Sequence, residues 1–147
     1  MHKFEFSLET LLKYRIRLEE REKERLAWIH YRLENEQRNI ERLQARHSAI
    51  RAELAQSRRK DYDGGEVAWY SAFLRRMDGE IEQARSRLAG LKRDLEEQMA
   101  VWVERSKDRK VLEKLRGRKE REHDTAVEKL EQKMVDELVV TQFANKK

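Results

Sequence analysis

The chain is rich in charge and contains neither proline nor cysteine. Of its 147 residues, 43% are Asp, Glu, Lys or Arg and only 38% are hydrophobic, against usual values of about 25% and 45–50%. This balance argues against a thick globular core, the absence of proline permits uninterrupted helices, and the absence of cysteine excludes disulfides, thiolate nucleophiles and Cys-based zinc sites. The net charge of +5 arises from 34 basic and 29 acidic side chains, so the signs nearly cancel, as on a solvated helix surface.

The first predicted helix begins near Leu8. Ser7 is suited to the N-cap position, and Phe6 and Leu11 occupy the two positions of a hydrophobic staple. The residues before this helix are charged, and no window approaches the roughly 18 consecutive apolar residues of a membrane span. We therefore expect a soluble, cytoplasmic protein without membrane insertion.

Glycine marks the predicted chain reversal. The sequence RRKDYDGG, which ends at Gly65, places basic residues in a last helical turn and follows them with turn formers and two glycines. We predict helix one over about residues 8–60, a turn over 61–65 and helix two over about 66–140.

Apolar residues recur at alternating steps of three and four in both predicted helices. This spacing is the heptad pattern of a coiled coil, and two such stretches on either side of one reversal should pair antiparallel. The sequence therefore predicts an all-α fold, a long two-helix antiparallel coiled-coil hairpin forming a single rod over residues 1–147. The predicted seam contains Leu26, Ile29, Leu33, Glu36, Ile40, Leu43, His47, Ile50 and Leu54 on helix one, and Val67, Tyr70, Leu74, Met77, Ile81, Ala84, Leu88, Leu91, Leu95, Gln98 and Trp102 on helix two.

The second predicted helix overhangs the first. Residues 104–122 of helix two are mostly charged, and beyond them Val127, Leu130, Met134 and Leu138 form a new apolar stripe without an intrachain partner. We expect the overhanging end of helix two to bind a partner. The stripe could also pair between chains, so the pattern leaves monomer and dimer open.

The sequence lacks the patterns of an enzyme or a metal site. It contains no phosphate-binding glycine loop and no nucleophile elbow, and its four histidines include no i, i+4 pair. His47 lies on the seam, where it serves either as a pH-sensitive contact or as a polar residue that fixes the register. The acidic residues are expected to pair with bases one turn on, as Glu9 can with Lys13. We predict no catalytic residue, cofactor or metal.

A basic cluster between residues 105 and 121 raises the question of nucleic-acid binding. Counterion release could hold such a cluster on a polyanion, but acidic residues interrupt it and no recognised reading motif is present. We expect no specific nucleic acid as partner, and interpret the cluster as a face that contacts a protein surface.

Three segments of this chain resemble a known family. They are FEFSLETLL at residues 4–12, WYSAFL at 69–74 just after the reversal, and EQKMVDE at 131–137. In order and placement they look like the bacterial flagellar export protein FliJ, and the resemblance covers nearly the whole chain.

The resemblance implies a non-enzymatic central stalk and coupling factor of the flagellar type III protein export apparatus, which links and stimulates the export ATPase ring. Such a protein is expected to be peripherally associated with the inner-membrane export apparatus. Its terminal end is expected in the central hole of the export ATPase hexamer, with the rest reaching toward the membrane export gate protein, and other export chaperones are further possible partners. The alternatives are the stalk of a virulence type III secretion system, a generic coiled-coil tether or an export chaperone.

The resemblance also suggests candidate contact residues. Those expected to contact the ATPase ring are Arg105, Arg109, Lys110, Arg116, Arg118, Leu130, Met134 and Leu138. Those expected to contact the export gate are Leu43, Ile50, Tyr70, Phe73 and Met77. Several of the gate candidates fall on the predicted seam, where they could simply hold the helices together. Phe73 is one position off the seam, so it is the better candidate for an exposed anchor.

Overall fold

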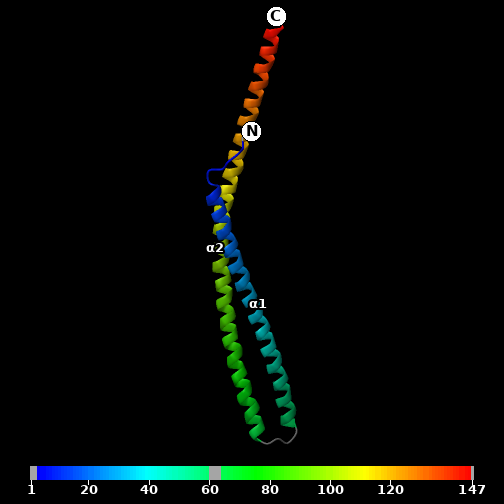
Figure 1. The fold of residues 1–147 in the computed structure, drawn as a ribbon. Coiled ribbons are helices and arrows are strands. Elements are labelled where there is room, and N and C mark those ends of the chain that lie inside the picture. The colour runs from blue at the N-terminus through cyan, green and yellow to red at the C-terminus, as the bar shows by residue number, and fades with distance from the viewer. Residues whose placement is uncertain (1–2, 60–63, 147) are drawn as a thin grey trace. The chain divides into compact units, whose positions relative to one another are not determined.

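The protein is built from two long helices. The computed structural model describes residues 3–59 and 64–146, which form α1 (Glu9–Arg59) and α2 (Gly64–Asn145) and include no strand (Figure 1). The two helices run antiparallel where they pair, and α2 continues beyond the start of α1. The predicted all-α, two-helix hairpin with an overhanging second helix is confirmed.

The helix ends differ slightly from the prediction. α1 starts at Glu9, one residue late, where the backbone N–H groups of Glu9 and Leu12 donate to the carbonyls of Phe6 and Leu8. α2 runs to Asn145, beyond the predicted end near residue 140. Of the predicted turn, residues 61–63 lie outside the described part of the chain.

The two glycines of that predicted turn are helical. Gly64 and Gly65 lie in the first turn of α2, and no glycine within the described ranges has a positive φ. The expectation that they form the reversal is therefore wrong. Glycine is tolerated where a helix begins, because the first N–H groups of a helix have no partner within it.

The packed residues divide into two units. The hairpin unit comprises Glu22–Trp102, and the terminal unit comprises Met1–Arg21 with Val103–Lys147. Each unit contains a stretch of α1 beside a stretch of α2. The predicted seam residues all lie in the hairpin unit. The overhang, the part of α2 that follows Asp124, lies in the terminal unit.

The heptad seam packs as the sequence predicts. Every predicted seam residue on both helices is buried or half-buried. The most enclosed are Met77 and Ala84, with exposed fractions of 3% and 0%. Since fully burying a large aliphatic side chain contributes about 1.5–3 kcal/mol, this row of contacts is the main tertiary stabilisation of the unit.

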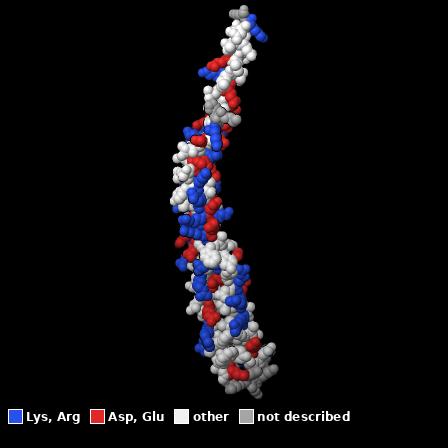
Figure 2. Space-filling model, viewed as in Figure 1, with Lys and Arg blue, Asp and Glu red and all other residues white. Residues whose placement is uncertain are grey.

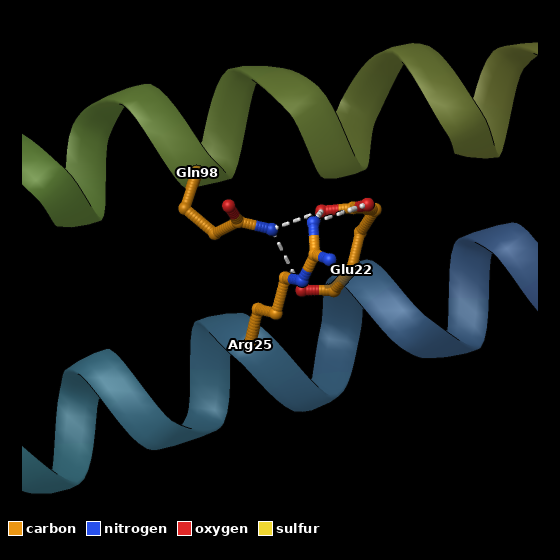
Figure 3. Close-up of polar contacts among 3 residues, drawn as sticks. All are labelled: Glu22, Arg25 and Gln98. Atoms are coloured by element: carbon orange, nitrogen blue, oxygen red, sulfur yellow. Dashed lines mark hydrogen bonds and ion pairs between the residues drawn. The ribbon is translucent and has the colours of Figure 1, made fainter.

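A polar layer interrupts the apolar seam (Figure 3). The Glu22 side chain is buried, and its Oε2 accepts a hydrogen bond of 2.5 Å from Nε2 of Gln98, which also donates to the Glu22 carbonyl at 3.1 Å. Arg25 lies one turn along α1 and donates to Oε1 of Glu22 at 3.2 Å. Because a slipped register would leave this carboxylate without its donor from α2, the layer fixes the alignment of the helices.

We expect Gln98→Leu to destabilise the hairpin unit by about 1–3 kcal/mol, because it removes a donor from a buried carboxylate. The double variant Glu22→Leu/Gln98→Leu should recover that loss, since it replaces the whole polar layer by apolar contacts. Thermal unfolding followed by circular dichroism measures both. Equal stability of the single and double variants would contradict the role given to Glu22.

Candidate partner-binding surfaces

The terminal unit has a small apolar core. Leu12 of α1 and Leu112 of α2 are each only 4% exposed, whereas Leu8 and Leu11 are exposed. Leu12 rather than Leu11 therefore continues the buried face of α1 in this unit. Ion pairs also join the two helices in this unit.

Arg109 forms the centre of one ionic contact. Its Nε donates to Oε2 of Glu19 on α1, and its Nη1 donates to Oε2 of Glu113 at 2.6 Å. The hydrogen bond to Glu19 raises the pKa of Arg109 above its ordinary value, and the bond to Glu113 adds to the effect. Both carboxylates favour the charged guanidinium.

Arg116 forms a second contact about two turns further along α2. Its Nε donates to Oε2 of Glu9 at 3.0 Å, and its guanidinium carbon lies 5.7 Å from the ring centre of Phe4. The hydrogen bond to Glu9 raises the pKa of Arg116 as well. The ring of Phe4 also lies 5.6 Å from that of His123, so the segment before α1 packs on α2.

These contacts change the interpretation of two ring-contact candidates. Glu9 reaches across to α2, where the sequence suggested a pair with Lys13 on its own helix. Arg109 and Arg116 thus hold α1 against α2. Because the pKa of each is raised, the stabilisation is fully present below the ordinary pKa of arginine and is lost only above it, so these guanidinium groups stay charged throughout neutral pH.

Other basic residues of α2 remain available to a partner. A groove along α2 is lined by four of them, and within the described ranges none of the four forms an ion pair. They are Lys110, Lys114, Arg118 and Arg121. Lys110 and Arg118 were predicted as ring contacts, and Lys114 and Arg121 were not. Arg105, also predicted, is half-buried beside the buried Ser106.

The overhang exposes apolar side chains on an otherwise charged protein. The predicted residues Leu130, Met134 and Leu138 are 48%, 63% and 62% exposed. Four more large apolar residues of this segment are exposed: Val135, Val139, Val140 and Phe143. Figure 2 shows charged side chains of both signs along much of the visible face and mainly uncharged surface toward the C-terminal end of α2.

The predicted gate residues lie mostly in the seam. Met77 is 3% exposed, and Leu43, Ile50 and Tyr70 are half-buried. Their burial between the helices gives them a packing role whether or not they also contact a partner.

Phe73 has a different environment, because it is off the seam and half-buried. Its ring stacks on that of Trp69 with centres 5.4 Å apart, and the guanidinium of Arg46 on α1 lies 5.5 Å from its centre. Trp69 is 58% exposed, although it was not among the predicted contact residues. Its exposure could have been inferred from its position outside the 3,4 stripe.

A second exposed aromatic pair was also missed. Trp28 and Tyr31 of α1 are 60% and 52% exposed, and their rings stack with centres 5.7 Å apart. Both residues lie off the seam, three positions apart on the outer side of α1.

His47 lies on the seam, as predicted. Its Nε2 is 2.8 Å from Oδ1 of Asp78 on α2, a distance that suits an ion pair when the imidazole is protonated. The two groups are not aligned for a hydrogen bond. A second contact between the helices, from Arg87 to Glu36 at 3.2 Å, involves the other predicted polar residue of the α1 seam.

The described residues show neither a cluster of metal ligands nor a membrane-spanning helix. They contain no group of three His, Cys, Asp or Glu side chains that could hold a metal ion. Neither α1 nor α2, over the residues described, includes a stretch apolar enough to cross a membrane.

Comparison with known proteins identifies the family. The family model described as flagellar FliJ protein matches residues 4–147. The chain belongs to the FliJ family. Searches of curated proteins and of solved structures gave no match. Membership in the FliJ family makes this protein a component of the flagellar export apparatus, in a family that is not catalytic, and favours the flagellar over the virulence alternative.

For this FliJ family member we expect Arg109→Gln to destabilise the terminal unit by about 1 kcal/mol, because the ion pair with Glu19 is partly shielded from solvent. Added salt should reduce the difference from the wild type. The matched control is Lys107→Gln, whose pair with Glu104 is well exposed and should contribute little. Thermal unfolding at low and high salt measures both, and equal effects of the two substitutions would rule out a special role for Arg109.

Proposed function

We propose that this protein is the central stalk and coupling factor of the flagellar export ATPase. In this role the overhang of α2 enters the ATPase ring and the hairpin unit contacts the export gate. The observation that carries the proposal is the overhang, where seven large apolar side chains are exposed between Leu130 and Phe143. Exposed apolar surface of this extent on a charged helix is typical of a binding site.

The pattern of the overhang suits a ring better than a single flat surface. Leu130, Met134 and Leu138 recur at i, i+4 and form one stripe, and Val135, Val139 and Phe143 form a second stripe beside it. A helix with a broad apolar surface is buried by partners on more than one side. The central hole of a hexameric ring would provide such an environment.

The unpaired basic residues of α2 also support a location of the overhang in the ATPase ring. Lys110, Lys114 and Arg118 lie on α2 ahead of the overhang and would meet the mouth of a ring that holds the overhang. An asymmetric helix inside a ring favours those subunit conformations that contact it best, so it can bias the catalytic cycle through differential binding. Arg109 and Arg116 contribute indirectly, since they hold the terminal unit together.

Truncation after Asp124 tests the ring contact. The variant keeps both ionic contacts between the helices and removes the overhang, so it should fold as a helical protein but no longer stimulate the purified export ATPase. The double charge reversal Lys110→Glu/Arg118→Glu should weaken stimulation several-fold and reduce its tolerance of salt. As a control, Arg93→Glu in the hairpin unit should leave stimulation intact. Full stimulation by the truncated protein would refute the ring contact.

For the gate contact, we propose the stacked pair of Trp69 and Phe73 as the anchor. The pair is off the seam, partly exposed and flanked by Arg46, and aromatic and arginine side chains are enriched among residues that dominate binding energy. The gate candidates on the seam would then act by positioning this pair.

The variants Trp69→Ala and Phe73→Ala should each weaken binding to the purified cytoplasmic part of the gate by about tenfold or more, with little change in helicity. Trp28→Ala is the matched control, since Trp28 is equally exposed and stacked but lies on α1, whereas Trp69 and Phe73 lie on α2. Calorimetric titration measures binding. A large loss of thermal stability in Phe73→Ala with unchanged gate binding would assign Phe73 to packing instead.

A further inference from the structure

A row of exposed basic side chains runs along one face of α2 ahead of the overhang. Lys110, Lys114 and Arg118 are each four residues apart and Arg121 follows three residues later, so the row extends over about 16 Å. These side chains line a groove whose lining residues all belong to α2. The groove is therefore a surface of α2 to which α1 contributes no side chain.

The four basic residues of the groove differ from their neighbours, because none of them has an acidic partner in the part of the chain that the structure describes. On the same stretch of α2, Arg109 and Arg116 pair with carboxylates of α1. Lys119 pairs with Glu122 on its own helix. Glu113, the acidic residue that lines the groove, is paired with Arg109 at 2.6 Å. The groove thus carries an unbalanced positive charge, which favours an acidic partner.

The groove also contains apolar surface. Val111 is 62% exposed and Leu115 is half-buried. Apart from its neighbours in sequence, a Cβ atom added at Gly117 would meet only the side chain of Arg121, at 3.8 Å. Packing within the chain therefore does not require glycine at this position, although glycine weakens a helix relative to alanine. The missing side chain lets a partner approach the backbone of α2 closely.

We propose that this groove binds an acidic amphipathic segment of the export ATPase, at the mouth of the ring that holds the overhang. The inference rests on the proposed function and adds to it the chemistry of the ATPase surface. The segment carries carboxylates about 6 Å apart, which match the rise of four residues between successive basic side chains of the row. Its apolar side chains cover Val111 and Gly117. Because the groove occupies one face of α2, it binds a single subunit and makes the contact with the ring asymmetric.

Reversal of one charge tests the acidic contact. Lys114→Glu should weaken binding of the full-length protein to the purified export ATPase several-fold, and added salt should reduce the difference from the wild type. Biolayer interferometry at low and high salt measures the binding. Lys119→Glu is the matched control, since it makes the same change of charge on α2 at a lysine already paired with Glu122, and it should bind as the wild type does.

Two outcomes of this comparison would overturn the proposal. Equal losses in Lys114→Glu and Lys119→Glu would show a general electrostatic attraction without a defined site. Unchanged ATPase binding of Lys114→Glu, together with weakened binding to duplex DNA, would assign the groove to nucleic acid.

Filling the groove tests its shape. Gly117→Leu should weaken ATPase binding several-fold, because the leucine side chain occupies space that the partner needs. The same substitution should raise the midpoint of thermal unfolding, since leucine favours a helix more than glycine does. Weaker binding by a more stable protein distinguishes a contact with the ATPase from a packing role. Unchanged binding would exclude the groove as the docking site.

Cross-linking identifies the partner segment. The chain contains no cysteine, so Val111→Cys provides a single attachment site for a photoreactive group in the groove. We expect the full-length protein to be linked to an Asp- and Glu-rich peptide of the ATPase, identified by mass spectrometry. A link to a peptide without acidic residues, or no link while stimulation persists, would refute the groove contact and leave the stalk proposal standing. A link to an acidic peptide without stimulation would support the groove contact and refute the coupling role.

Discussion

The apolar seam between α1 and α2 is the constraint on which the structure depends. Helical hydrogen bonds satisfy most of the backbone within each helix, but they do not hold one helix to the other. That task falls on a single row of side chains such as Ile40, Met77 and Ala84, which have no further layer behind them. Where α1 provides no partner, the apolar residues of α2 are exposed. The overhang therefore presents an apolar surface.

Polar contacts set the alignment that the apolar seam alone would leave open. A regular heptad stripe packs similarly after a slip of one heptad, because leucine and isoleucine contacts are not directional. The hydrogen bond of Glu22 with Gln98 and the ion pair of Glu36 with Arg87 each have one correct partner on the other helix. In the terminal unit, the ion pairs of Arg109 and Arg116 with α1 set the alignment in the same way, and fewer buried apolar side chains accompany them. The basic residues of α2 thus divide into those that hold α1 and those left for a partner.

Much of the fold was predictable because helical coiled coils are encoded locally. The uninterrupted helices follow from the absence of proline, and the buried seam from Leu26 to Trp102 follows from the 3,4 spacing of its apolar residues. In the overhang, Leu130, Met134 and Leu138 are exposed as predicted, whereas Val127 is half-buried. The prediction was wrong at Gly64 and Gly65, which are helical. Glycine permits a turn but does not require one, so the glycines alone could not show that α2 begins at Gly64, two residues before the predicted start.

The sequence by itself determined two helices, the residues of their seam and the exposed stripe around Met134, since these depend only on which residues recur on one face of a helix. Only the tertiary structure decided which charges are used within the chain. In sequence Arg109 and Lys110 look equivalent, yet one binds Glu19 and the other faces a groove. The choice of partner for Glu9, the contact of Arg46 with Phe73 and the burial of Glu22 also depend on distances between residues remote in sequence. Those distances are set by the alignment of the two helices, which no local pattern contains.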